Sequence, residues 1–86
     1  MKLTPDRLAV LKAIQRFLNE TGFAPNHRHI AVKCGKEPYA ADWARAKIKA
    51  LLDTGLIYVS GRKFGARTYQ LTETGRAALA EAERDE

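Results

Sequence analysis

The hydrophobic period of the chain changes at Gly55, and this change constrains the fold more than any other feature. Before Gly55, apolar residues recur every three or four positions, which is the spacing of amphipathic helices. After it, residues 56–60 and 66–71 are rich in β-forming side chains, and the segment 61–65 between them has a glycine at each end. The pattern predicts helices followed by a β-hairpin whose loop spans 61–65.

Two helices are expected in the first 35 residues. The first begins after Thr4, a hydroxyl N-cap followed by a proline, and ends at Thr21-Gly22. The second spans 27–34 and is capped by Asn26. His29 stands where a carboxylate would accept from the cap's own N–H group, and a histidine is not expected to do so.

A third helix is expected within residues 38–54. The turn before it is short and is bracketed by Gly35 and Pro38, which is the layout of a helix-turn-helix. A fourth helix starts after Thr72, with residues 71, 75, 78, 79 and 82 along one stripe.

Three helices, a hairpin and a last helix predict a mainly α fold, a winged helix-turn-helix with a three-helix core, a two-stranded wing and a C-terminal helix. The expected organisation is one domain over 1–86, with the helix-turn-helix at about 26–54, the wing at about 56–71 and the last helix at about 72–84. A hairpin is marginal alone, so it must pack on the helices. The side chains expected to do so are Ile57, Val59, Tyr69 and Leu71.

The third helix has an unusual outer face. At 100° per residue its core side carries Ala41, Ala44, Ile48, Leu51 and Leu52. The opposite side carries Tyr39, Asp42, Trp43, Ala46 and Ala50, with Arg45, Lys47 and Lys49 on the flanks. Such a face indicates contact with a DNA groove or with another protein. A plainer interpretation is that the two aromatic side chains cover the core where the wing or the first helix leans over.

The net charge of +5 is unevenly placed. Residues 28–67 hold nine cations and three acids, whereas residues 72–86 hold two cations and five acids. A basic middle segment indicates a polyanion as partner. The alternative is a surface whose charge is only unevenly scattered.

Several classes of function are disfavoured. The single cysteine, Cys34, excludes an intrachain disulfide, and the absence of a long apolar run or a signal peptide predicts a cytoplasmic protein without a membrane span. The spacing of His27, His29 and Cys34 matches no zinc template, so no metal or cofactor is expected. No nucleophile has a neighbouring base, so an enzyme is not expected.

Several short runs carry a resemblance to a known family. They are Leu3-Thr4-Pro5, Glu20-Thr21-Gly22-Phe23, Pro25, Ile30-Ala31, Gly35, Ile48-Lys49-Ala50-Leu51, Gly55-Leu56-Ile57 and Val59-Ser60-Gly61. With them, residues 3–61 resemble the DNA-binding domain of LexA-type repressors, without the protease domain of that family. The run 69–76 is similar to the end of the wing in other bacterial winged-helix regulators. The resemblance implies DNA binding and a role in transcription, with repressor as the family's activity, but it does not imply the same operator or the same regulation. The segment 35–55 is slightly longer than in the family, so base-reading positions do not carry over one for one.

The resulting hypothesis is sequence-specific binding of double-stranded DNA by a bacterial or phage regulator. The third helix enters the major groove and the wing contacts the backbone or the minor groove. Base edges are expected to meet Tyr39, Asp42, Trp43 and Ala46, and phosphates to meet Arg28, Lys36, Arg45, Lys47, Lys49, Arg62 and Lys63. About five such contacts predict a salt slope of about −4 to −5.

Two further partners stay open. A protein partner would bind an aromatic anchor made of Tyr39, Trp43 and Phe64. A homodimer would form through Ala78, Leu79 and Ala82 of the last helix, unless that stripe packs on its own domain. The cations at 62 and 63 could equally be only the polar tip of a hairpin.

Overall fold

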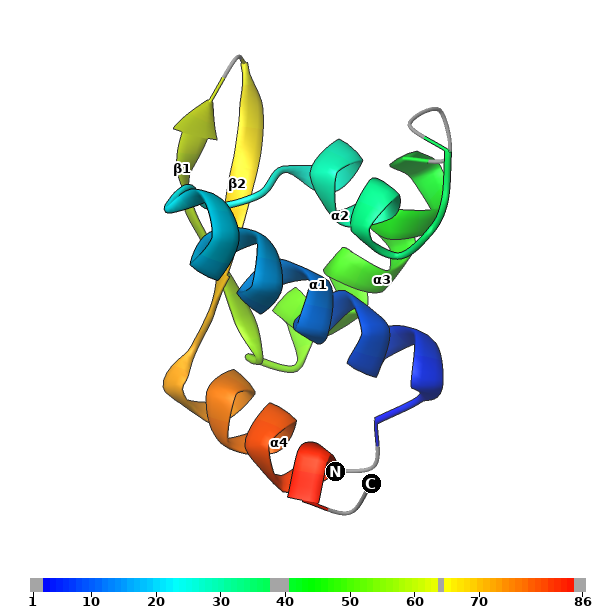
Figure 1. The fold of residues 1–86 in the computed structure, drawn as a ribbon, viewed down its shortest axis with the longest axis vertical. Helices are drawn as coiled ribbons and strands as arrows, with labels where there is room; N and C mark the ends of the chain where they lie inside the picture. The colour runs from blue at the N-terminus through cyan, green and yellow to red at the C-terminus, as the bar shows by residue number, and fades with distance from the viewer. Residues whose placement is uncertain (1–2, 38–40, 64, 85–86) are drawn as a thin grey trace.

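The computed structural model describes residues 3–37, 41–63 and 65–84. The elements confirm the predicted order of three helices, an antiparallel hairpin and a last helix (Figure 1). They are α1 (Pro5–Thr21), α2 (His27–Lys33), α3 (Ala41–Asp53), β1 (Ile57–Lys63), β2 (Ala66–Leu71) and α4 (Glu73–Arg84).

Helix α1 begins and ends as its sequence predicts. The Arg7 N–H donates to Thr4 Oγ1 at 3.2 Å, and Pro5 occupies the first turn, where its missing N–H costs nothing. At the other end, Gly22 takes a left-handed conformation with φ 77° and donates its N–H to the Leu18 carbonyl at 2.8 Å. Both ends are therefore fixed by local chemistry.

The start of α2 corrects the expectation for His29. The Asn26 side chain accepts from the His29 N–H at 3.0 Å, and His29 Nδ1 accepts from the Asn26 N–H at 3.3 Å. A neutral imidazole with its proton on Nε2 has a free lone pair on Nδ1, so it completes the capping box as a carboxylate would. The ring also stacks on Phe17, with 4.5 Å between ring centroids.

This cap makes stability depend on pH. Burial, aided by the charge of Lys63, lowers the folded pKa of His29 below its ordinary value of 6.5. The unfolded chain therefore binds more protons between the two values, so stability is complete above pH 6.5 and is lost as pH falls through the folded pKa. We expect the thermal unfolding midpoint to decrease as the pH is lowered from 7 to 5.

The matched variant is His29→Gln, because glutamine keeps an acceptor for the cap but does not titrate. Its midpoint, followed by circular dichroism, should fall less steeply over the same pH range. His27 keeps part of the dependence in both proteins, because its pKa is also lowered, by burial and by Arg45 and Arg28. Equal slopes for the two proteins would contradict the role given to His29.

The hairpin is longer than predicted. β1 continues through Gly61, Arg62 and Lys63, which were expected to lie in the loop. A bulge near Ser60 shifts the register, so that Val59 pairs with Tyr69 but Gly61 pairs with Thr68. Beyond the bulge, Arg62 pairs with Arg67 and Lys63 with Ala66, so β1 extends to the tip while β2 has the predicted bounds.

The inner face of the hairpin packs on the helices mostly as expected. Ile57, Tyr69 and Leu71 are buried in the core, whereas Val59 is 43% exposed and does not take the predicted place. Tyr69, the cross-strand partner of Val59, is buried because β2 packs on α1, α2 and α4, whereas β1 packs mainly on α3 and leaves Val59 open to solvent. A backbone hydrogen bond from the Tyr69 N–H to the Pro25 carbonyl, at 3.0 Å, ties β2 to the α1–α2 connector.

Helix α4 is docked by the run from Thr72 to Gly75. Thr72 Oγ1 donates to the Gly55 carbonyl at 2.7 Å and accepts from the Gly75 N–H at 3.0 Å, and the Thr72 N–H donates to the Leu56 carbonyl at 3.0 Å. Leu79 is 6% exposed and joins the core, and Ala78 packs against it. Two of the three residues proposed for a dimer therefore pack within the chain, whereas Ala82 is half-buried and the dimer stays a prediction.

Candidate nucleic-acid interface

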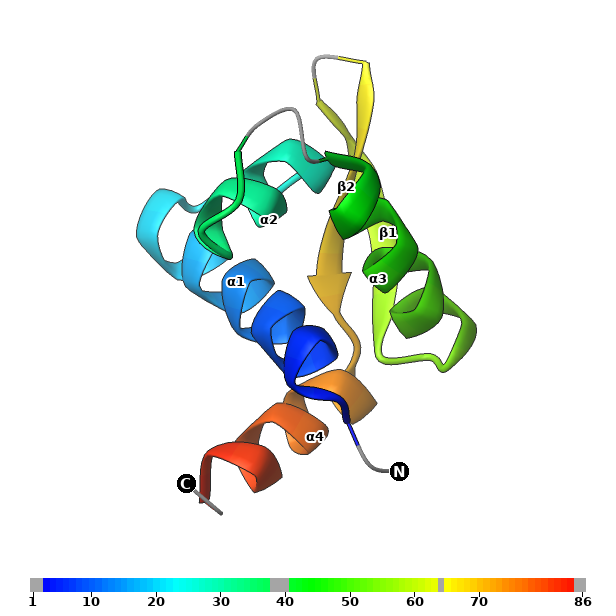
Figure 2. The same ribbon diagram turned by 90° about the vertical axis from the view of Figure 1, so that its right-hand side faces the viewer.

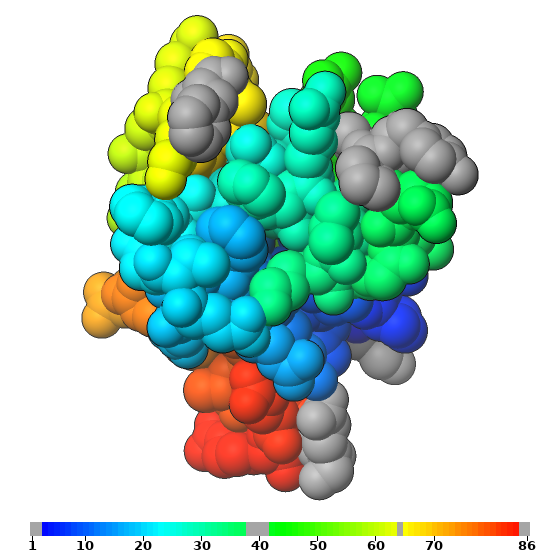
Figure 3. Space-filling view, turned by 45° about the horizontal axis from the view of Figure 1, so that its top comes forward, coloured from blue at the N-terminus to red at the C-terminus, as the bar shows by residue number. Residues whose placement is uncertain are grey.

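The hairpin tip and the N-terminal half of α3 lie at the same end of the molecule. Figures 1 and 2 show both at the upper end, with α4 at the opposite end. Figure 3 looks toward that end and shows α2 between the hairpin and α3. A helix and a hairpin that project together can reach one duplex, because the major groove admits an α-helix.

Charged side chains converge where α2 and α3 begin. Arg28 and Arg45 are exposed, and Arg45 Nη1 lies 3.6 Å from Asp42 Oδ1. His27 lies among them. Burial and the charges of Arg45 and Arg28 lower its pKa, whereas the charge of Asp42 opposes that shift. Cations from α2 and α3 therefore disfavour protonation of the His27 imidazole. A phosphate bound beside them would offset this repulsion. His27 was not among the predicted contacts.

Two arginines stand side by side on the hairpin. Arg62 and Arg67 are paired residues of the antiparallel register, and both are exposed. Directly opposite residues in a hairpin project from the same face, so the two guanidinium groups share one side. Arg62 was predicted and Arg67 was missed. Arg67 was missed because residues 61–65 were expected to lie in a loop. In that assignment Arg62 is not in a strand and cannot be the cross-strand neighbour of Arg67.

Lys63 is held differently from the prediction. Its Nζ lies 3.4 Å from the centroid of the Phe23 ring, and the residue is half-buried. Phe23 belongs to the connector between α1 and α2 and is itself exposed. The cation–π contact joins the hairpin to the helical part. Lys63 therefore positions the hairpin instead of extending from it.

Trp43 corrects the prediction for the outer face of α3. The side chain is half-buried and packs against the core, and Lys36 Nζ lies 5.0 Å from the centroid of its ring. A side chain as long as that of tryptophan can reach round the helix from its outer side to apolar surface, which the helical projection does not show. The plainer interpretation holds for Trp43. Tyr39 and Phe64 lie outside the described residues.

Two of the predicted phosphate contacts are in other positions. Lys47 is half-buried and its Nζ lies 3.5 Å from Asp6 Oδ2, so it faces the start of α1. Lys49 is exposed, but it lies in the C-terminal half of α3, where its Nζ contacts Asp53 Oδ2 at 2.9 Å. The remaining predicted contacts are exposed and described, namely Arg28, Lys36, Asp42, Arg45, Ala46 and Arg62.

Comparison with known proteins supports the architecture. The chain is similar to the crystal structure of a candidate DNA-binding protein from Ralstonia eutropha, with a TM-score of 0.71, 23% sequence identity, and coverage of 94% of this chain and 98% of the other. The fold is a winged helix-turn-helix. No protein-family model and no curated protein sequence matches the chain. The resemblance to LexA-type repressors stays a prediction from the residues that carry it.

Within residues 3–37, 41–63 and 65–84, no three His, Cys, Asp or Glu side chains gather as metal ligands would. No helix in that part of the chain is both long and apolar enough to cross a membrane.

Proposed function

We propose that the chain binds double-stranded DNA as a bacterial or phage transcription regulator. In this proposal α3 enters the major groove, and the wing contacts the backbone or the minor groove. The observation that carries it is the placement of four exposed arginines at the end shared by the wing and α3. They are Arg28 on α2, which lines a hollow together with Gly65 and Ala66 at the hairpin tip, Arg45 on α3, which acts on His27 as Arg28 does, and the paired Arg62 and Arg67 on the wing. The candidate DNA-binding protein with the same fold agrees with this proposal.

The outer face of α3 supplies the groups for base reading. Asp42 and Ala46 are exposed, one helical turn apart, in the N-terminal half of the helix. A carboxylate accepts from the amino group of cytosine, and a small side chain lets the helix approach the groove closely. Asp42 is already oriented by Arg45, and Arg45 in turn is placed to reach a phosphate. This division assigns sequence reading to α3 and positioning to the arginines.

The test is the salt dependence of duplex binding. Five exposed cations, the four arginines and Lys36, predict a slope of log K against log salt of about −4.5, from about −0.9 per neutralised phosphate. Fluorescence anisotropy of a labelled random duplex, titrated with the protein from 50 to 200 mM salt, measures it. Absence of binding at 50 mM salt would refute DNA binding. A slope shallower than −2 would refute the proposed interface.

The alternative is a protein-binding module. Of its three proposed anchor residues only Trp43 is described, and Trp43 packs against the core. An aromatic anchor must be free to enter a partner's pocket, so the structure favours DNA over this alternative. The alternative gains weight if no duplex binds at low salt and a partner captured from cell extract is lost with Trp43→Ala.

A further inference from the structure

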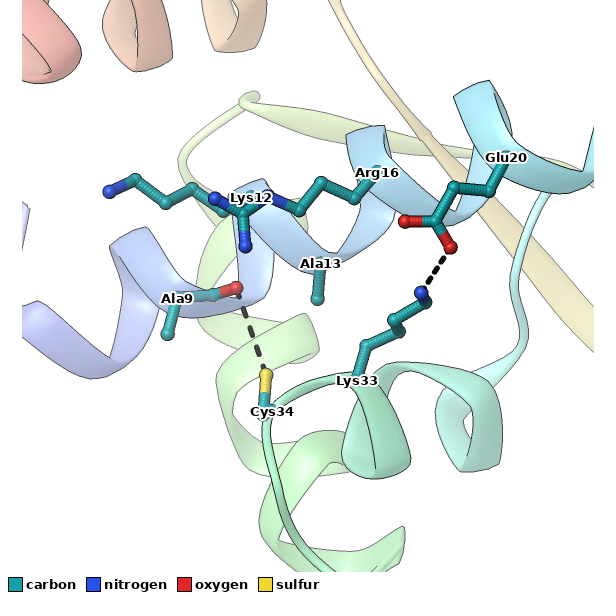
Figure 4. A pocket seen from close by; sticks show the side chains of 7 residues that line it. All are labelled: Ala9, Lys12, Ala13, Arg16, Glu20, Lys33 and Cys34. Atoms are coloured by element: carbon teal, nitrogen blue, oxygen red, sulfur yellow. Dashed lines mark hydrogen bonds and ion pairs between the residues drawn. The ribbon is translucent and has the colours of Figure 1, made fainter.

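A second charged site lies on the other side of α2. A pocket of about 430 Å³ opens between the middle of α1 and the end of α2 (Figure 4). Figure 2 shows α1 and α2 on one side of the molecule, with α3 and the wing on the other. None of the residues that line the pocket belongs to the interface proposed for DNA. Its lining residues are Ala9, Lys12, Ala13, Arg16, Glu20, Lys33 and Cys34.

The rim of this pocket is cationic. Lys12 and Arg16 come from α1 and Lys33 comes from α2, against a single carboxylate, Glu20. In Figure 4 the Arg16 side chain extends along α1 toward Ala9, while Lys33 rises from α2 and pairs with Glu20. A net charge of two positive units from two helices favours an anion between them. A guanidinium offers such an anion two parallel donors.

The floor of the pocket is made of small side chains. Ala13 is buried, and Cys34 is half-buried with its Sγ donating weakly to the Ala9 carbonyl at 3.7 Å. Burial raises the pKa of the Cys34 thiol, so the floor stays uncharged. An uncharged floor below a cationic rim matches a ligand with an acidic group at one end and an apolar body at the other.

We propose that this pocket binds a small organic carboxylate. Its carboxylate is held by Arg16 and is joined by Lys33 when that side chain leaves Glu20, and its apolar body rests on Ala13 and Cys34. In binding, the ligand competes with Glu20 for Lys33, because both offer a carboxylate to the same ammonium group. The ligand contacts both α1 and α2, and α2 is the first helix of the helix-turn-helix.

Benzoate is the probe, and the single cysteine reports its binding. We expect benzoate to slow the reaction of Cys34 with a maleimide reagent in a saturable manner, and to shift the backbone amide signals of residues 9–16 and 33–34. Benzamide has the same shape without the charge and should do neither. Inorganic phosphate has no apolar body and should bind more weakly than benzoate.

Two variants of the pocket are expected to change the affinity for benzoate in opposite directions. Arg16→Gln should raise the dissociation constant for benzoate about tenfold, the effect of losing a hydrogen bond to a charged group. Glu20→Gln should lower it by up to about fivefold, because an exposed ion pair that competes with the ligand is removed. Arg84→Gln removes one charge from the last turn of α4, does not alter any residue that lines the pocket, and should leave the dissociation constant unchanged.

The proposal is overturned if benzoate leaves Cys34 and these amides unchanged, or if Arg16→Gln binds it as the unaltered protein does. Equal binding of benzamide would overturn the role of the charge, and phosphate binding as tight as benzoate would overturn the role of the floor. Weaker binding in Glu20→Gln would overturn the competition. Circular dichroism confirms that each variant is folded before it is compared.

Discussion

The double variant Arg62→Gln, Arg67→Gln is expected to bind duplex DNA about 60-fold more weakly at 0.1 M salt. The two guanidinium groups project side by side from the wing, and each phosphate contact contributes about 0.9 decade of affinity between 1 M and 0.1 M salt. The slope of log K against log salt should change from about −4.5 to about −2.7. Anisotropy titrations of both proteins at four salt concentrations measure both quantities.

The matched control is Arg84→Gln, which removes one charge from the opposite end of the molecule. It should leave the slope unchanged, because the arginine lies in the last turn of α4. If the double variant and this control weakened binding equally, net charge and not the wing would govern affinity. An unaltered slope in the double variant would show that the wing does not touch phosphates.

Gly75→Ala is expected to cause the largest loss of stability. A Cβ at this position would overlap the carbonyl oxygen of Leu56 and lie 2.9 Å from its carbonyl carbon. Backbone cannot rotate away as a side chain does, so α4 must lift from the α3–β1 turn. The hydrogen bonds of Thr72 and the burial of Leu79 are then disturbed together.

The size of the effect follows from the small total stability. A chain of 86 residues has about 4–13 kcal/mol, and overpacking against backbone costs about 3 kcal/mol or more. The thermal midpoint should fall by at least about 12 °C. Gly61→Ala is the matched control, because its added Cβ would meet only Thr68 Oγ1, at 3.8 Å. Similar midpoints for the two variants would contradict the close approach at Gly75.

The exposed cations of the candidate site could be predicted where their exposure depends on local charge. The prediction failed where a side chain's position depends on packing. Arg28, Arg45 and Arg62 could be named from the sequence because exposed cations near a helix start or a hairpin tip need no knowledge of the core. Arg67 required the strand register, and Lys47 required the position of Asp6, 41 residues earlier in the chain. Neither the strand register nor the contact between Lys47 and Asp6 can be predicted from the spacing of residues along the chain or from the helical period.

His29 shows the same limit at a single hydrogen bond. The sequence placed it correctly at the third position of α2, and the error lay in treating the cap as a task for a carboxylate alone. The neighbouring Phe17 ring, stacked at 4.5 Å, holds the imidazole so that Nδ1 faces the Asn26 N–H. A contact between two elements therefore decided what one side chain could do.

The order of the elements, the caps of α1 and the basic character of the middle of the chain could be predicted from the sequence alone. These follow from interactions among residues a few positions apart and from composition. The packed molecule was needed to show that Trp43 turns toward the core, that Leu79 packs within the chain, and that four arginines from α2, α3 and the wing lie near one another. Those outcomes depend on which surfaces the packed helices leave uncovered, and that competition for buried area has no local signature.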